Sequence, residues 1–122
     1  MIAGAVSAYR EPIIRLDARG PKGMQSFEAV VDTGFSDYLT MSRQTIGDLG
    51  LRYLGPTKAE LADGSEVIAD LYRAEALWNG RYIAIDVVAA EGPPLVGMAM
   101  MYGYNLSVDV LDGGRVILDL LP

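Results

Sequence analysis

Glycine-containing turn signals recur along this sequence and separate short apolar runs. The chain has 14 glycines in 122 residues, and its turn signals include Asp63-Gly64 and Asn79-Gly80. Such pairs, flanked by apolar or alternating runs, are the strongest short-range signals for β-hairpins. Turns at this spacing leave room for many short strands and for few helices. The sequence therefore predicts an all-β fold.

The runs between these turns indicate where the strands lie. Helix signals are few: Ser42 is a good N-cap and Gly50 a good C-terminal stop for a helix over 43–49. A second single helical turn is expected over 98–102. Strands are expected over residues 2–8, 12–18, 24–31, 37–41, 57–62, 65–78, 81–89, 106–111 and 116–120. We expect residues 1–122 to form a single domain, a closed β-barrel with one or two short helices.

The composition excludes several kinds of chemistry. The chain contains no cysteine and no histidine. Disulfides, thiolate or imidazole metal sites and cysteine nucleophiles are therefore excluded, as is Ser-His-Asp catalysis, which needs an imidazole base. The sequence contains no Asp-x-Asp-x-Asp loop, which is the pattern of a carboxylate metal site. We therefore expect no metal and no cofactor. Acid–base chemistry falls to Asp, Glu, Lys or Tyr.

Charge and hydropathy limit the partners. The chain carries 16 acidic and 10 basic side chains, a formal charge of −6, and a negative surface repels phosphate backbones. Nucleic acid is therefore not expected as a partner. No apolar run approaches the 18 residues of a membrane span, so no membrane partner is expected either. A cysteine-free chain is typical of the cytoplasm, which is the expected location.

One segment has the pattern of a site for chemistry. Asp32 directly follows the apolar pair Val30-Val31 and precedes Thr33 and Gly34. A strand end would hold the carboxylate in place, and Gly34 would let a ligand backbone approach. Thr33 can hydrogen-bond its surroundings and lock the loop. Taken alone, the same tripeptide is also typical of an Asx turn at a strand end.

Together with two further features, this motif resembles the retropepsin-like (clan AA) aspartic proteases. The first feature is Val31-Asp32-Thr33-Gly34, and the second is a hairpin centred on Asp63-Gly64, where the family has its flap. The third is Leu95-Val96-Gly97, which is similar to the apolar-apolar-Gly segment that crosses beside the catalytic loop. The three lie in the family's order, and the resemblance covers residues 4–120. It implies a single-lobe, closed acid-protease β-barrel.

The resemblance also implies an activity and a set of site residues. The implied activity is an aspartic endopeptidase that hydrolyses a peptide or protein substrate. Because the chain has one Asp-Thr-Gly, the implied enzyme is a homodimer in which two Asp32 carboxyls activate a water. Asp32 would be catalytic, with Thr33 and Gly34 supporting the active-site loop. Residues implied to bind substrate are Phe35, Asp37, Asp63, Gly64 and Gly97.

The chain departs from the family pattern at three places. Phe35 stands where a small residue usually follows the motif, and it would either pack under the loop or narrow the site. The helix after Gly97 reads Met98-Ala99-Met100-Met101 and lacks a polar residue often found there. The expected flap tip has no clear aromatic residue, although Tyr53 and Tyr72 are within range. These departures bear on substrate preference more than on fold.

Two other readings stay open at this point. A retropepsin-like dimer can serve as a non-catalytic binding or assembly module in which Asp32 is only structural. A small monomeric β-barrel that binds a ligand, with Asp-Thr-Gly as a turn, is the other reading.

Overall fold

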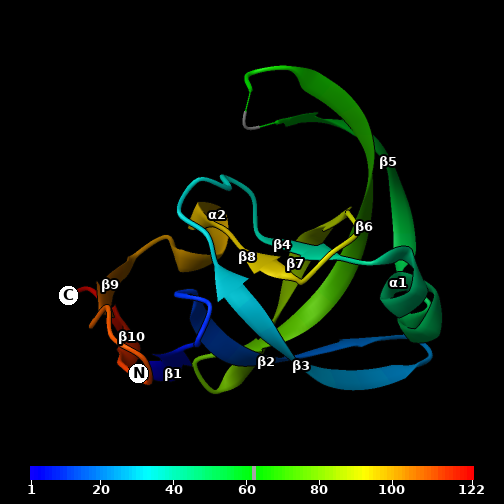
Figure 1. The fold of residues 1–122 in the computed structure, drawn as a ribbon. Helices are drawn as coiled ribbons and strands as arrows, with labels where there is room; N and C mark the ends of the chain where they lie inside the picture. The colour runs from blue at the N-terminus through cyan, green and yellow to red at the C-terminus, as the bar shows by residue number, and fades with distance from the viewer. Residues whose placement is uncertain (62) are drawn as a thin grey trace.

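The computed structural model describes residues 1–61 and 63–122 (Figure 1). Its described part consists of ten strands, two short helices and connecting loops, which confirms the all-β class. The helices are α1 (Arg43–Leu49) and α2 (Met98–Met101). The strands are β1 (Ile2–Val6), β2 (Pro12–Gly20), β3 (Gly23–Val31), β4 (Leu39–Met41), β5 (Arg52–Glu60), β6 (Glu66–Trp78), β7 (Arg81–Ala89), β8 (Leu95–Val96), β9 (Tyr104–Val108) and β10 (Arg115–Leu120).

Six of the strands close into a barrel. The strand order of the whole sheet is β5-β6-β7-β4-β8-β3-β2-β1-β10-β9, and an additional pairing joins β6 to β2. In that pairing Asp17, Ala18 and Arg19 lie opposite Leu77, Ala76 and Glu75. This contact turns β6, β7, β4, β8, β3 and β2 into a ring, so these strands leave few free edges.

The core lies inside the barrel, and the strand pattern explains why. Successive side chains of a strand point to opposite faces, so one face can be apolar while the other is solvated. In β2, Ile14, Leu16 and Ala18 are at most 3% exposed, and the residues between them are not buried. Ala76 in β6 and Leu118 in β10 are fully buried in the same cluster. Alternating burial of this kind provides the main apolar stabilisation of the barrel.

Helix α1 has the bounds that the sequence predicts. The Ser42 hydroxyl accepts a hydrogen bond from the Thr45 N–H at 3.2 Å, and Gly50 ends the helix in the left-handed conformation with φ 64°. Ile46 and Leu49 are buried and attach the helix to the core. Among the described residues, no helix is long and apolar enough to cross a membrane.

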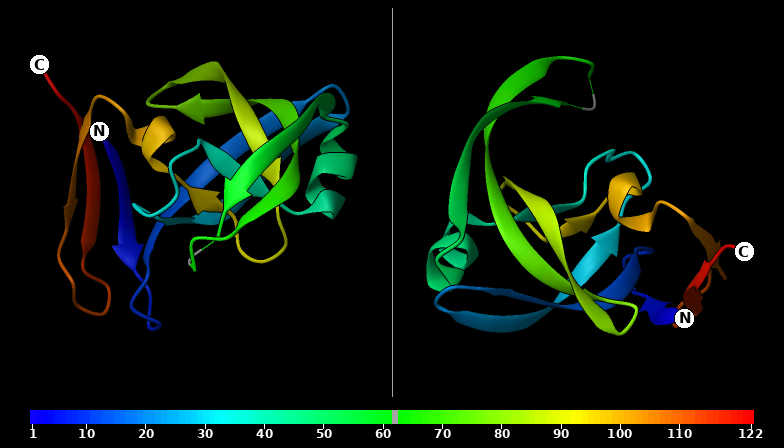
Figure 2. Two further views of the ribbon diagram at one scale, coloured as in Figure 1. Left: turned by 90° about the horizontal axis from the view of Figure 1, so that it is seen from above. Right: turned by 180° about the vertical axis from the view of Figure 1, so that it is seen from behind.

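The hairpin β5–β6 extends well beyond the barrel. Strand β6 pairs with β7 only from Leu71 onwards, so residues 56–60 of β5 and 66–70 of β6 pair only with each other. We call residues 56–70 the flap hairpin. Figure 1 shows it arching over the open side of the barrel, and the views in Figure 2 agree. A two-stranded ribbon of this kind has little stability of its own in water.

The start of β5 differs from the sequence prediction. The sequence places this strand at 57–62, whereas β5 begins at Arg52 and ends at Glu60. Gly55 and Pro56 have the pattern of a break, but in the structure the strand continues through them: the register shifts between Tyr53 and Gly55 in a β-bulge, and Gly55 has φ 125°. Residue 62 of the predicted strand lies outside the described residues.

The two ends of the chain form one further three-stranded region. Strand β10 pairs with β1 on one side and β9 on the other, and β1 also pairs with β2. The terminal strands therefore pair within the chain, and the two termini lie near each other (Figure 1). The turn between β9 and β10 is longer than predicted. Strand β9 spans 104–108 instead of 106–111, because Gly114 packs against Asp109, where an added Cβ would lie 1.8 Å from the carbonyl oxygen.

Candidate active site

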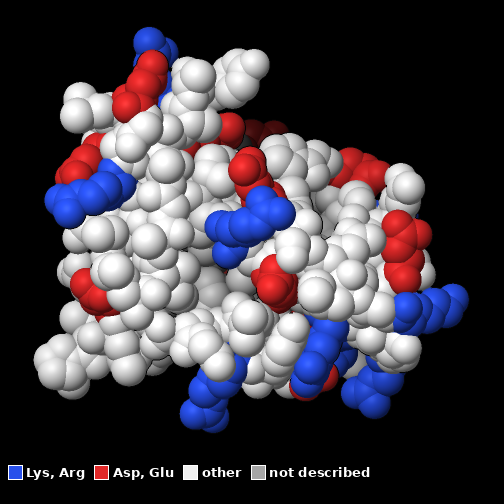
Figure 3. Space-filling view, turned by 90° about the horizontal axis from the view of Figure 1, so that it is seen from below, with Lys and Arg blue, Asp and Glu red and all other residues white. Residues whose placement is uncertain are grey.

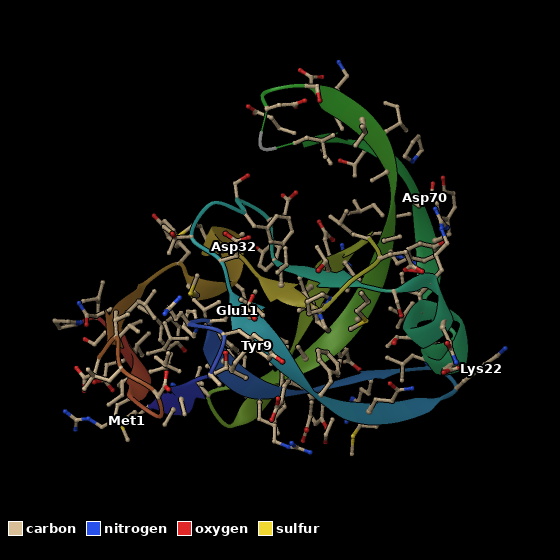
Figure 4. All side chains as sticks on the ribbon, viewed as in Figure 1. Met1, Tyr9, Glu11, Lys22, Asp32 and Asp70 are labelled. Atoms are coloured by element: carbon tan, nitrogen blue, oxygen red, sulfur yellow. The ribbon has the colours of Figure 1, made fainter. Side chains whose placement is uncertain are left out.

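Asp32 lies on the loop that leaves β3. Its backbone N–H donates to the Val96 carbonyl at 2.9 Å, which continues the parallel pairing of β3 with β8. The Gly34 N–H donates to Oδ1 of Asp32 at 2.8 Å, and the Phe35 N–H donates to the Asp32 carbonyl at 3.2 Å. The carboxylate is therefore held by the backbone of its own loop and of a neighbouring strand. Asp32 is half-buried, and Figure 4 places it at the end of β3 facing the space beneath the flap hairpin.

Gly97 lies directly against this loop. A Cβ at Gly97 would lie 2.1 Å from the Asp37 carbonyl oxygen and 2.6 Å from the Phe35 carbonyl oxygen. The Gly97 N–H donates to the backbone carbonyl oxygen of Tyr38 at 3.0 Å, and the Met98 N–H donates to that of Phe35 at 2.8 Å. Only a residue without a side chain can approach backbone so closely. The segment β8–α2 thus supports the whole loop 32–38 from one side.

The same contacts explain why β4 is shorter than predicted. The carbonyls of Asp37 and Tyr38 accept from the N–H groups of Ala99 and Gly97, at 3.2 and 3.0 Å. These residues therefore belong to the supported loop, and the strand begins at Leu39. Thr40, which is buried, accepts the Leu95 N–H at its hydroxyl at 2.8 Å and so joins β4 to the start of β8.

A cleft of about 770 Å³ lies between this loop and the flap hairpin. A volume in this range suits a ligand of peptide or drug size. Its lining residues come from the loop after β3, from both strands of the hairpin and from β8: Asp32, Gly34, Phe35, Ser36, Asp37, Lys58, Ala59, Glu60, Leu61, Glu66 and Leu95. The cleft thus brings together segments that are far apart in the sequence.

Most of the residues predicted from the sequence lie at or against this cleft. Asp32, Gly34, Phe35 and Asp37 line it, and Gly97 packs beneath the loop that carries them. Thr33 is exposed, and it is not part of the described lining.

Asp63 and Gly64 lie at the hairpin tip, outside the described lining. The Leu61 N–H donates to the Ser65 carbonyl at 2.7 Å, and Gly64 has φ 84°, as a tight turn requires. The backbone N–H and hydroxyl of Ser65 both donate to Oδ1 of Asp63, at 2.9 and 2.6 Å. The hydroxyl bond, followed by the N–H bond, lowers the pKa of the Asp63 carboxyl below its usual value. Asp63 thus stabilises the turn, and it influences the cleft only through the hairpin.

The sequence reasoning missed the hairpin side of the cleft. Lys58, Glu60, Leu61 and Glu66 line it, together with Leu95 opposite. Each of the hairpin residues lies within a few positions of the Asp63-Gly64 turn signal, so the turn itself was the available clue. The curvature that brings these strands over Asp32 has no local sequence signal.

Most of the charged side chains that line the cleft are acidic. Asp32, Asp37, Glu60 and Glu66 contribute carboxylates, and Lys58 contributes an ammonium group that lies 3.8 Å from Glu66. On the opposite face of the molecule, basic and acidic side chains are interspersed (Figure 3). Among the described residues, no group of three or more Asp, Glu, His or Cys side chains has the geometry of a metal site. The chemistry that these residues offer is proton transfer by carboxylates.

The fold has a counterpart among solved structures. The chain superposes on the crystal structure of a retropepsin-like aspartic protease from Rickettsia conorii with a TM-score of 0.63. The match covers 96% of this chain and 87% of the other, at 18% sequence identity. No protein-family model matches the sequence, and no curated protein matches it either. The chain therefore has a retropepsin-like fold, as the resemblance of its motifs implied.

Proposed function

We propose that residues 1–122 form one aspartic endopeptidase domain that acts as a homodimer. The observation that carries this proposal is the Asp32 carboxylate, held by the Gly34 N–H at 2.8 Å on the floor of the cleft beneath the flap hairpin. A positioned carboxylate in a cleft of peptide size is the minimum that this chemistry needs. The retropepsin-like fold supports the same assignment by analogy.

The need for a second chain follows from the number of carboxylates. Acid–base hydrolysis of an amide needs one group that takes a proton from water and one that gives a proton to the carbonyl. The chain has one Asp-Thr-Gly, and Thr33 and Gly34, which follow Asp32 in the loop 32–38, are exposed. A twofold axis beside this loop would bring two Asp32 side chains together, with the Thr33 hydroxyls joining the two loops.

In the dimer the two Asp32 carboxyls would share one proton. Two like charges about 3 Å apart repel each other strongly, and one proton held between the two carboxyls relieves that repulsion. The ionised carboxylate takes a proton from a water between the two groups, and the protonated carboxyl donates to the scissile carbonyl. The water oxygen bonds to the carbonyl carbon, which gives a neutral tetrahedral diol.

Collapse of the diol completes the reaction. One carboxyl protonates the leaving amine nitrogen, the other carboxylate takes a proton from a diol hydroxyl, and the carbon–nitrogen bond breaks. The products are an acid and an amine, and the two carboxyls again hold one proton. Steps of this kind contribute about 10²–10⁴-fold each. Holding the peptide between the loop and the flap hairpin supplies orientation. Gly34 and Asp37 would contact the peptide backbone, and Phe35 would shape one side pocket.

The test compares the wild type with Asp32→Asn on a mixed peptide library from acid to neutral pH. We expect cleavage by the wild type and a loss of at least about 10³-fold in the variant, because the amide can neither take nor share the proton. Activity should follow a bell-shaped pH profile on the acid side of neutrality. Asp48→Asn, an exposed change on α1 outside the cleft, is the matched control and should keep full activity.

Two results would count against this proposal. Equal cleavage by the wild type and Asp32→Asn would remove Asp32 from the mechanism. Folded, dimeric wild type without cleavage at any acid pH would favour a non-catalytic module instead.

A further inference from the structure

The base of the flap hairpin is the level at which its strands stop pairing with the rest of the sheet. On β6, pairing with the barrel strand β7 begins at Leu71, which lies opposite Val88. On β5, the bulge at Gly55 interrupts the register just before the free part of the hairpin, where Pro56 lies opposite Asp70. The free part of the hairpin thus begins at the same level on both strands. Beyond this level, no sheet pairing in the described chain holds the hairpin over the cleft.

A cluster of side chains bridges this base to α1. Nη2 of Arg43 donates to Oδ2 of Asp70 at 2.7 Å, and the Tyr53 hydroxyl donates to Oδ1 of the same carboxylate at 3.2 Å. The Tyr53 ring meets the Tyr72 ring edge-on, with centroids 5.3 Å apart. The Asp70 carboxylate therefore accepts one hydrogen bond from α1 and one from β5, on the two sides of the base. We call Arg43, Tyr53 and Asp70 the base cluster.

The helix end of this cluster is firmly attached. Arg43 is the first residue of α1 and lies two positions after β4, whose three residues are all buried. Strand β4 lies between β7 and β8 in the barrel and leads back to the loop of Asp32. The Ser42 cap fixes the start of the helix. Arg43 thus gives the hairpin a contact to the same rigid segment that carries the candidate site.

We propose that the base cluster positions the flap hairpin over the cleft, with Asp70 as the positioning residue and Gly55 as the hinge. A swing of the hairpin about its base moves Asp70 relative to α1, so it breaks the bonds to Arg43 and Tyr53. The intact cluster therefore favours the arched position seen in Figure 4, where Asp70 lies at the base beside α1 and away from Asp32. Its effect on catalysis rests on the proposed function, whereas the cluster's effect on the hairpin does not.

The charge state of the cluster suits an enzyme that works in acid. The hydrogen bond from Arg43 is the main cause that lowers the pKa of Asp70 below its usual value. The same bond raises the pKa of Arg43. The carboxylate consequently stays ionised to lower pH than a free aspartate, and the contact to Arg43 persists with it.

A matched pair of variants tests the cluster without any substrate. Asp70→Asn removes the charge at the base, and Asp86→Asn removes an equivalent one from the pair Arg73–Asp86, which lies 2.9 Å apart on the barrel strands β6 and β7. The two aspartates have similar exposure, 32% and 37%. Hydrogen–deuterium exchange of the amides in residues 56–70 is the measurement. We expect about 2- to 5-fold faster exchange in Asp70→Asn only, the range that an exposed ion pair allows.

A second set of variants tests whether the residues act together. If Arg43 acts through Asp70, the double variant Arg43→Gln/Asp70→Asn should exchange no faster than Asp70→Asn alone. Tyr53→Phe removes only a hydroxyl and should give a smaller increase in the same segment. It keeps the test usable if Asp70→Asn does not fold. Equal exchange in Asp70→Asn and Asp86→Asn, or additive effects in the double variant, would overturn the proposal.

Peptide hydrolysis gives the functional readout. We expect Asp70→Asn to raise KM about 2- to 5-fold with kcat nearly unchanged, because a mispositioned flap weakens substrate binding more than proton transfer. A fall in kcat with an unchanged KM would contradict a positioning role. If the exchange result holds while the wild type cleaves nothing, the base cluster stands and the proposed function fails.

Discussion

At the scale of single residues, the site depends on the absence of a side chain at two glycines, Gly34 and Gly97. Gly34 brings its N–H to the Asp32 carboxylate, and Gly97 lets β8 and α2 lie against the loop backbone. Two of the three atoms nearest to a Cβ at Gly97 are the backbone carbonyl oxygens of Asp37 and Phe35, which cannot move aside as a flexible side chain can; the third is on the Phe35 ring. A side chain at this position would therefore displace the loop that orients Asp32.

Gly97→Ala should lower the free energy of unfolding by about 2 kcal/mol or more and reduce peptidase activity, because its Cβ would lie 2.1 Å from the Asp37 carbonyl oxygen. Urea denaturation measures the first effect. Gly47→Ala is the control, since nothing lies within 4 Å of its added Cβ in α1, and it should stabilise the protein by about 0.5–1 kcal/mol. Equal stability of the two variants would contradict the role of Gly97.

At the scale of elements, local sequence signals set the type and the ends of an element, and long-range contacts set its placement. Helix α1 begins and ends where its caps are, and the β6–β7 hairpin turns at Asn79-Gly80, whose φ values of 50° and 89° fit a type I′ turn. The flap hairpin differs, because its turn signal is local but its position over the cleft depends on α1. Element type was accordingly easier to predict than element placement.

Ser42→Ala should lower the free energy of unfolding by about 1 kcal/mol, because it removes the cap that accepts the Thr45 N–H. The same change should loosen the flap hairpin slightly, since Arg43 follows the cap directly. Thermal or urea unfolding measures the stability, with Ser107→Ala on exposed β9 as a control that should change little. A loss in Ser107→Ala as large as in Ser42→Ala would argue against the cap.

At the scale of the whole molecule, one chain carries one Asp-Thr-Gly carboxylate, Asp32, where the proposed reaction pairs two. The β2–β6 pairing closes the barrel, and the loop of Asp32 and the flap hairpin lie on the same open side (Figure 1). The terminal strands β1 and β10 pair within the chain, so they are not free to form the dimer by exchange. The twofold axis that we propose beside the exposed Thr33 and Gly34 leaves this pairing intact.

If the active form is a homodimer, the rate per chain should rise with protein concentration until the dimer is fully formed. Activity at low concentration should then follow the square of the concentration, since neither chain alone holds both carboxyls. Peptide hydrolysis over a dilution series, beside sedimentation velocity at the same concentrations, measures both quantities. A constant rate per chain in the range where sedimentation finds only monomer would contradict the shared site.

The sequence by itself determined the all-β class, helix α1, the Asn79-Gly80 hairpin and the position of Asp32 directly after a strand that ends in an apolar pair. These features depend on residues within a few positions of one another, where caps, turns and alternation act. The tertiary structure alone decided that β2 closes on β6, that the flap hairpin arches over Asp32, and that Arg43 meets Asp70. An apolar pattern says which face of a strand is buried, but it does not say which distant strand or side chain will cover it.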